Sequence, residues 1–295
     1  MARINLRGMG VALITPFLKD KSIDYNSLAR LIDYQIKNGV DYIVALGTTA
    51  ETPALTTAEK EELKKFIASR VAKRVPLVVG CGGNNTAAVA AEVADIDTSL
   101  FDAVLSVVPY YNKPSQEGIY QHYSAISQAS KLPVILYNVP GRTGVNMSAE
   151  TTLRLAYDHH NIVAVKEASG NINQMDEIIQ QKPEEFNVIS GDDGITFPLI
   201  NLGAIGVISV IGNAFPKEFA KMVRLALSGD YENARHIHHR FNQLFNLLFV
   251  DGNPAGVKCL LHAMGFIENE LRLPLVPTRI TTYEKIRRVL DSFES

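Results

Sequence analysis

Lys166 is the residue of this chain with the clearest chemical potential. It follows the apolar run at residues 162–165 and lacks the amphipathic spacing that places a lysine on a solvated helix face. We therefore expect it on a buried strand. Burial beside apolar side chains disfavours the ammonium form of lysine, so part of the population should be a neutral amine near neutral pH. A neutral amine can attack a ketone carbon, which makes Lys166 a candidate for Schiff-base formation.

Polar, glycine-rich segments follow the other apolar runs of the chain. They occupy residues 15–16, 47–51, 81–84, 109–112, 137–144, 166–167, 191–193 and 208–209. Their threonine and tyrosine hydroxyls could move protons while a carbinolamine collapses, and the guanidinium of Arg142 could hold a carboxylate by two parallel hydrogen bonds. If these segments meet around Lys166, the combination indicates carbonyl chemistry.

Eight short apolar runs rich in β-branched residues should form the strands that position these groups. They lie at residues 10–14, 42–46, 76–80, 103–108, 133–137, 162–165, 187–189 and 205–210. Segments with helical periodicity separate them, with capping candidates at Ser22 or Asp24, Thr56 or Thr57, and Ser115. Strand and helix alternating eight times predict an α/β fold, a (β/α)8 TIM barrel with its active site at the carboxyl ends of the strands. An open doubly wound sheet is the less favoured alternative, because the first βα turn lacks GxGxxG.

The chain continues for about 85 residues after the eighth run, which is more than one barrel helix needs. A helix beginning at Pro216 should complete the barrel, and two further helical faces rich in apolar residues follow it. We therefore expect a barrel catalytic domain at residues 1–228 and a C-terminal helical domain, the appendix, at residues 229–295. No flexible linker separates the two, so the appendix should dock on the barrel.

Composition restricts the class of protein and the partners. The chain has 295 residues, 46% hydrophobic and 20% charged, and a net charge of −2, which favours a soluble globular protein that binds small molecules, not nucleic acid or a membrane. Cys81 and Cys259 lack metal-ligand spacing, which indicates a cytoplasmic chain without disulfides. We expect no cofactor and no metal, because the pair Asp192 and Asp193 is better explained as loop capping.

Six segments occur in a fixed order along the chain: GTTAET, PYYNKPSQEG, YNVPGRTGV, VKEASGN, SGDD and GVISV. Together they resemble the dihydrodipicolinate synthase family, and the resemblance covers almost the whole chain, including NPAGVK at residues 253–258. It implies a lyase that condenses pyruvate with L-aspartate 4-semialdehyde, through a Schiff base, to 4-hydroxy-tetrahydrodipicolinate in lysine and diaminopimelate biosynthesis. It also implies a homotetramer built as a dimer of dimers.

The same resemblance implies roles for individual residues. Lys166 corresponds to the lysine that forms the imine with pyruvate. Tyr137, Thr49 and Tyr111 correspond to a relay of hydroxyl groups, in which Tyr111 comes from the neighbouring subunit. Phenol and alcohol oxygens suit a relay because they pass protons without adding a charge beside the amine.

Four further residues correspond to substrate-binding positions of the family. Thr48 corresponds to the residue that binds the pyruvate carboxylate, and the main chain at Gly191 and Ile208 corresponds to the walls of the pyruvate pocket. Arg142 corresponds to the residue that receives the carboxylate of the semialdehyde.

Other functions remain open at this point. Pyruvate-dependent aldolases that act on N-acetylneuraminate or a 2-keto-3-deoxy acid share the lysine and the tyrosine, although Arg142 favours the synthase. An isomerase could use Glu51 or Glu167 as acid or base, and a binding-only barrel would need no nucleophile. Reduction with borohydride separates imine chemistry from the last two.

Two departures from the family pattern carry expectations. Ala50 stands where the family usually has glycine, which should matter little unless the turn requires a positive φ. Ala88 offers no carboxylate at the position that binds the ammonium of inhibitory lysine. Such family members often carry a histidine near Thr57 or Lys60, and here Lys60 would repel the effector. We therefore expect weak or absent inhibition by lysine.

Overall fold

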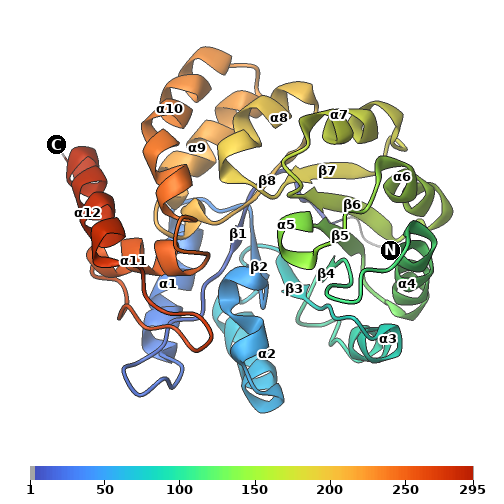
Figure 1. Ribbon diagram of the computed structural model, residues 1–295, viewed down its shortest axis with the longest axis horizontal. Helices are drawn as coiled ribbons and strands as arrows, with labels where there is room; N and C mark the ends of the chain where they lie inside the picture. Colours follow the sequence, from blue (N-terminus) through green and yellow to red (C-terminus); the bar gives the residue numbers. More distant parts are fainter. Residues whose placement is uncertain (1–3, 295) are drawn as a thin grey trace.

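Eight parallel strands close into a barrel in this computed structural model, which describes residues 4–294 (Figure 1). The strands are β1 (Gly8–Ala12), β2 (Tyr42–Ala45), β3 (Leu77–Gly80), β4 (Ala103–Val107), β5 (Val134–Asn138), β6 (Ile162–Glu167), β7 (Asn187–Ser190) and β8 (Gly206–Ser209). Each strand pairs with its neighbours in sequence, and β8 closes the barrel against β1, with Gly206 in register with Gly8. The predicted (β/α)8 fold and all eight predicted strands are confirmed, with ends displaced by one or two residues.

Helices cover the outside of the barrel (Figure 1). They are α1 (Tyr25–Lys37), α2 (Thr57–Val71), α3 (Thr86–Ala94), α4 (Gln116–Ala129), α5 (Pro140–Thr143), α6 (Ala149–Asp158), α7 (Ile172–Gln181), α8 (Thr196–Leu202), α9 (Pro216–Leu227), α10 (Tyr231–Leu247), α11 (Ala255–Ala263) and α12 (Ile280–Glu294). Four short 3-10 helices lie in loops: η1 (Thr48–Ala50), η2 (Thr52–Ala54), η3 (Asp193–Ile195) and η4 (Ile211–Asn213). Among the described residues, no helix is both long and apolar enough to span a membrane.

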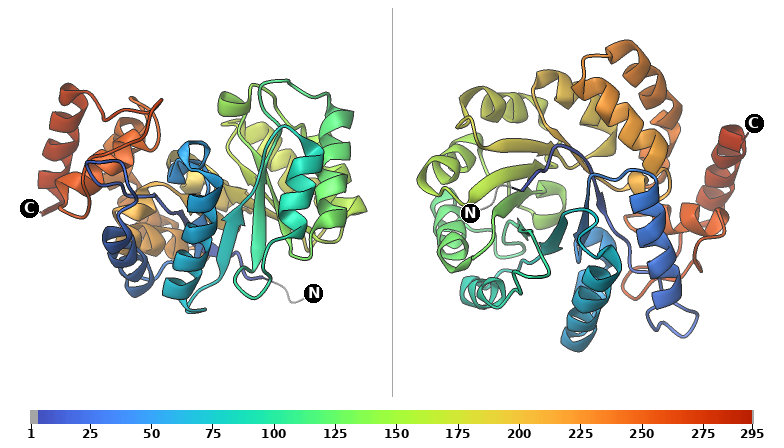
Figure 2. Two further views of the ribbon diagram at one scale, coloured as in Figure 1. Left: turned by 90° about the horizontal axis from the view of Figure 1, so that it is seen from below. Right: turned by 180° about the vertical axis from the view of Figure 1, so that it is seen from behind.

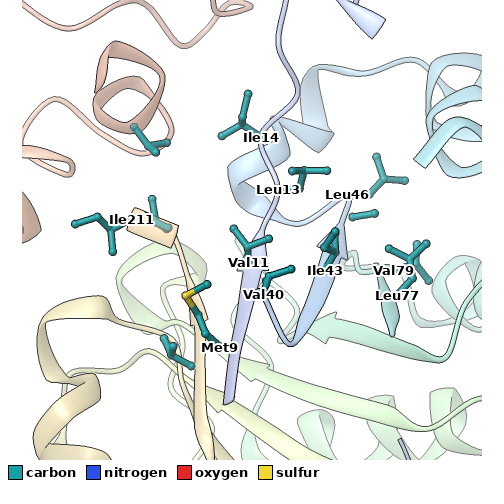
Figure 3. Packing of buried hydrophobic residues seen from close by; sticks show 14 of the residues in the cluster. Met9, Val11, Leu13, Ile14, Val40, Ile43, Leu46, Leu77, Val79 and Ile211 are labelled. Carbon is teal, nitrogen blue, oxygen red and sulfur yellow. The ribbon is translucent and has the colours of Figure 1, made fainter. Parts of the chain in front are cut away.

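The strands are apolar along their length because both of their faces are buried. In β2, Ile43 packs in the cluster between the sheet and the surrounding helices, whereas Val44 packs in a second cluster inside the barrel. Val11 and Val79, on the two strands beside β2, also belong to the outer cluster (Figure 3). The alternation of side chains along each strand therefore separates an outer core from an inner one.

The helix starts follow local capping chemistry. Asp24 accepts a hydrogen bond from the Ser27 amide at the start of α1. Thr56 and Glu59 form a reciprocal capping box at the start of α2, and Ser115 accepts from an amide at the start of α4. Each contact satisfies a helix N–H that has no partner within the helix. The capping predictions are confirmed, with Asp24 and Thr56 as the residues used.

The C-terminal helices pack beside α1 and α9, on the flank opposite α4 and α6 (Figures 1 and 2). Helix α10 contacts α8 and α9, and α11 contacts η4 and α12. Phe241 of α10 meets Phe219 of α9 edge to face, with ring centroids 5.7 Å apart. The appendix is docked on the barrel as expected, through an apolar core continuous with the outer one. The domain boundary at residues 228 and 229 stays a prediction; it falls in the turn between α9 and α10.

Candidate active site

Lys166 and Tyr137 lie side by side on neighbouring strands at the carboxyl end of the barrel. The two residues are in register between β5 and β6, and the Nζ of Lys166 is 4.3 Å from the centroid of the Tyr137 ring. Only 6% of Lys166 and 7% of Tyr137 is exposed. The buried strand position predicted for Lys166 is confirmed. This geometry gives the amine a phenol as a proton-carrying neighbour.

The next residue on each strand faces away from the barrel interior and holds the two strand ends together. Asn138 Nδ2 donates to both carboxylate oxygens of Glu167, at 3.2 and 3.1 Å. The same carboxylate accepts from the Ser169 amide at 2.8 Å and from Gln174 Nε2 at 3.0 Å. Burial raises the pKa of Glu167, although these hydrogen bonds act in the opposite direction.

These hydrogen bonds on the outer face of the sheet hold together the two strand ends that carry Tyr137 and Lys166 on the inner face. Sequence reasoning missed them, although the period-two alternation of a strand places the residue after each inward-facing one on the opposite face. The network also accounts for Glu167 without a general-base role. The carboxylate that an isomerase would need in the pocket instead binds groups on the outer face of the sheet.

Thr48 and Thr49 lie on a tight turn, the 3-10 helix η1, directly after β2. Two residues of left-handed conformation flank this turn, Leu46 at φ 54° and Glu51 at φ 55°. A non-glycine residue in that region costs roughly 1–3 kcal/mol and persists where the surroundings hold it. Ala50 is not among the residues with positive φ, so the methyl group that distinguishes it from glycine is tolerated.

Arg142 lies in α5, the single helical turn that follows β5 and ends at Gly144 in the left-handed region. Its side chain is exposed, and its Nη2 is 3.5 Å from the carbonyl oxygen of Asn253. Within the described residues Arg142 forms no ion pair, so the guanidinium is available to an anion.

The two aspartates after β7 serve the loop and do not pair with Arg142. Asp192 accepts from the Gly194 amide at 2.8 Å, and Asp193 accepts from the amides of Val210 and Ile211 at 3.0 and 2.8 Å. The predicted loop-capping role is confirmed. Complete burial raises the pKa of Asp193 to about 6, because a carboxylate loses its hydration there.

A cavity of about 350 Å³ opens beside these residues at the carboxyl end of the barrel. Thr48, Tyr137 and Arg142 all line it, so the structure brings together residues from two strand ends, Thr48 after β2 and the other two at the end of β5. Lys60, Cys81 and Glu92 line the same cavity.

Ala88 is exposed on α3 and carries no carboxylate. The weak or absent inhibition by lysine stays a prediction.

The two predicted wall residues lie on the last two strands. The amide of Gly191 donates to the Glu167 carbonyl at 2.8 Å, and a Cβ at this position would lie 2.7 Å from the Cβ of Ala168. Only glycine permits that approach. Ile208 packs in the inner cluster together with Tyr137. Gly191 therefore adjoins the end of β6, and Ile208 shares the inner core with Tyr137.

Tyr111 differs from the other predicted relay residues because its side chain is 87% exposed. Its backbone has φ 73°, and its amide donates to the Thr143 carbonyl at 3.3 Å. The hydroxyl forms no hydrogen bond with any described part of the chain. A single chain therefore does not bring Tyr111 into contact with Thr49 or Tyr137.

The arrangement as a whole suits imine chemistry. It combines a buried amine with a phenol in contact with it, and that phenol and a free guanidinium line one cavity. An amine nucleophile, a proton carrier and a carboxylate receptor are the groups that condensation of two keto or aldehyde acids requires.

Comparison with known proteins points in the same direction. The model of the dihydrodipicolinate synthetase family matches residues 5–293. The 4-hydroxy-tetrahydrodipicolinate synthase of Parabacteroides distasonis is 68% identical over 290 residues, which is 98% of each chain. The crystal structure of dihydrodipicolinate synthase from Aquifex aeolicus superposes with a TM-score of 0.95 at 42% identity, covering 98% of both chains. A monomeric dihydrodipicolinate synthase variant gives a TM-score of 0.94 at 43% identity, covering 97% of this chain and 96% of that one.

Proposed function

The chain belongs to the dihydrodipicolinate synthetase family, and from this premise we propose how its residues perform the reaction. The protein is a lyase that condenses pyruvate with L-aspartate 4-semialdehyde to 4-hydroxy-tetrahydrodipicolinate, in lysine and diaminopimelate biosynthesis. In our proposal Lys166 is the nucleophile. The observation that carries this assignment is the buried contact between its amine and the ring of Tyr137.

The first half of the reaction builds the imine. The neutral amine of Lys166 attacks the ketone carbon of pyruvate and forms a carbinolamine. Tyr137 protonates the carbinolamine oxygen, water leaves, and the imine results. Thr49 and Tyr111 resupply the proton along the relay. A chain of neutral hydroxyls suits this task because each oxygen can accept and donate in turn.

The second half joins the carbon skeletons. Loss of a proton from the methyl carbon of the imine gives an enamine, which attacks the aldehyde carbon of the semialdehyde. The amine of the semialdehyde then attacks the imine carbon, closes the ring and releases Lys166. In our proposal Thr48 binds the pyruvate carboxylate, the main chain at Gly191 and Ile208 forms the walls of the pyruvate pocket, and Arg142 binds the carboxylate of the semialdehyde. The free guanidinium on the cavity supports the last assignment.

A trapping experiment tests the imine. The protein is incubated with pyruvate and sodium borohydride, and its intact mass and tryptic peptides are measured. We expect one reduced pyruvyl adduct per chain, confined to Lys166. Lys258, the other buried lysine among the described residues, is an internal control and should remain unmodified. A folded protein without the adduct would overturn the proposal.

We also propose that the chain assembles as a homotetramer, a dimer of dimers, in the cytoplasm. The exposed Tyr111 supports an assembly in which this side chain meets a neighbouring subunit. Two free, buried cysteines, Cys81 and Cys259, support a reducing compartment. Sedimentation velocity at micromolar concentration tests the assembly, and a monomer that is fully active would contradict it.

A further inference from the structure

The start of α11 reaches back from the appendix to the turn that carries Thr49. Asn253 lies just before α11 and is only 6% exposed. Its side-chain Nδ2 donates a hydrogen bond of 3.1 Å to Thr49 Oγ1. Its main-chain oxygen is the group 3.5 Å from Arg142 Nη2. One residue of the appendix therefore contacts both a proposed relay hydroxyl and the proposed carboxylate receptor.

A second contact from the same segment holds the far end of the turn. Lys258 donates to the carboxylate of Glu51, and both side chains are completely buried. Glu51 also accepts from the Arg272 amide at 3.0 Å. The Lys258 ammonium donates to the Glu270 carbonyl at 2.9 Å and lies 4.2 Å from the centroid of the Phe17 ring. These contacts over-determine the left-handed conformation of Glu51, which ends η1.

The hydrogen bond from Asn253 restricts what the Thr49 hydroxyl can do. A hydroxyl oxygen that accepts a hydrogen bond from an N–H group cannot point its own proton toward that group. The proton of Thr49 is then free to point toward the relay. The Oδ1 of Asn253 is buried and has no hydrogen-bond partner among the described residues. Burial of an unpaired oxygen costs stability, so the presence of an amide at this position is not explained by its own hydrogen bonding.

We propose that Asn253 is a positioning residue that sets the direction in which Thr49 donates its proton, and that Lys258 keeps the turn in place through Glu51. The appendix is then a working part of the active site. This inference rests on the relay role proposed above for Thr49. It concerns orientation of the hydroxyl, and Asn253 itself need not touch a substrate.

Two substitutions at one position separate orientation from packing. Asn253→Ala removes the donor and lets the Thr49 hydroxyl rotate. Asn253→Asp replaces the donor with an acceptor of the same shape, so the Thr49 proton turns toward residue 253 and away from the relay. The matched controls are Asn161→Ala and Asn161→Asp. Asn161 accepts from the Ser127 hydroxyl at the amino end of β6, at the other end of the barrel.

We expect kcat to fall about 10-fold in Asn253→Ala and about 100-fold in Asn253→Asp, within the range that proton transfer contributes. The KM for pyruvate should stay within about threefold in both, because Thr48 is untouched. Borohydride trapping should give slower formation of the Lys166 adduct and the same final yield. The Asn161 variants should leave kcat within about twofold, with melting temperatures compared for all four proteins.

Three results would overturn the inference: Asn253→Asp as active as the wild type, equal losses of kcat in the two Asn253 variants, or a rise in the KM for pyruvate at unchanged kcat. Should Asn253→Asp fail to fold, Asn253→Ala alone tests the inference: a lower kcat at unchanged KM for pyruvate supports it, and a higher KM at unchanged kcat overturns it. Failure of the proposed function looks different, because the wild-type protein would then form no adduct on Lys166. Normal trapping by the wild type together with unaffected Asn253 variants rejects only the inference.

Discussion

At the scale of residues, the chemistry depends on a few side chains whose neighbours define their state. The amine of Lys166 is buried against the Tyr137 ring, and the guanidinium of Arg142 lines the cavity without an ion pair to any described residue. Each group is therefore free to interact with a bound substrate. An amine in contact with a phenol has a proton carrier beside it, and a free arginine fork binds a carboxylate at two points.

Tyr137→Phe tests the proton carrier. The ring and its contact with Lys166 are retained, and only the hydroxyl is lost. We expect kcat to fall roughly 10²- to 10⁴-fold, the usual contribution of a positioned acid or base. Steady-state assays with both substrates measure it. The control is Tyr123→Phe, which removes a buried hydroxyl that donates to the Ser106 carbonyl; its kcat should stay near that of the wild type. Equal losses in both variants would contradict the assignment.

Arg142→Ala tests the receptor of the second substrate. The KM for the semialdehyde should rise on the order of 10- to 100-fold, because a bidentate, charge-assisted contact is lost. Formation of the pyruvyl adduct should be unchanged, since the first half-reaction does not use this residue. Arg154→Ala removes an exposed arginine that pairs with Glu117 and should leave both quantities unaltered. A slower first half-reaction in Arg142→Ala would argue for a different role.

At the scale of elements, the strand ends and helix starts carry the site. Strands β5 and β6 present Tyr137 and Lys166 inward, while Asn138 and Glu167 tie the same two strand ends on the outer face. At the start of α2, Glu59 completes the capping box and also accepts from the guanidinium of Arg272 in the appendix. One carboxylate therefore supports a helix start and joins it to the C-terminal region.

Glu59→Gln tests this element through its pH dependence. The Arg272 guanidinium and the Thr56 contacts lower the pKa of Glu59 from 4.5 to about 2. Because the folded pKa lies below the unfolded one, the stabilisation is complete above about pH 4.5 and is lost as the pH falls toward 2. We expect Glu59→Gln to lower the free energy of unfolding by about 1–2 kcal/mol at pH 7.

Urea unfolding of both proteins from pH 7 to pH 2.5 measures the difference. The gap between wild type and Glu59→Gln should shrink below pH 4.5. Glu61→Gln is the matched control on the same helix. Within the described part of the chain Glu61 pairs only with Lys64, three residues away, so its loss should change stability little. If the difference in unfolding free energy stayed constant with pH, the charge on Glu59 would not contribute to stability.

At the scale of the whole molecule, the appendix packs against the barrel near the carboxyl ends of the strands. Their shared core is apolar, and the ion pair between Lys258 and Glu51 crosses from one to the other without solvent contact. Burial lowers the pKa of Lys258 to about 8, against the pull of the Glu51 carboxylate. Such a pair makes the position of the appendix specific, because either charge alone would be uncompensated.

A double-mutant cycle measures the pair. Lys258→Met should cost about 3–5 kcal/mol of unfolding free energy, because the Glu51 carboxylate remains buried without its cation. The double variant Glu51→Gln with Lys258→Met should cost less than Lys258→Met alone, since both charges are gone. Additive losses in the cycle would mean that the two side chains do not interact in solution.

Subunit complementation tests the proposed assembly. Lys166→Ala and Tyr111→Phe should each be nearly inactive alone. If Tyr111 serves a neighbouring subunit, mixing the two after subunit exchange creates sites that contain both wild-type residues, and activity should return to a measurable fraction of the wild type. Mixing Lys166→Ala with Tyr137→Phe is the control and should restore no activity, because these two residues share a site within one chain and neither chain then carries both. No recovery in the first mixture would contradict the proposal that Tyr111 serves a neighbouring subunit.

The sequence alone determined the elements and the chemistry they carry. Apolar β-branched runs encode strands buried on both faces, and caps such as Thr56 encode helix starts, because these preferences act over a few residues. The strand-end position of Lys166 followed from the same local pattern. The tertiary structure alone decided which distant groups meet. Asn138 with Glu167, Asn253 with Thr49, and Lys258 with Glu51 depend on barrel closure and on the docking angle of the appendix. Contacts between residues 29 to more than 200 positions apart leave no periodicity in the chain, so only the packed fold could place them.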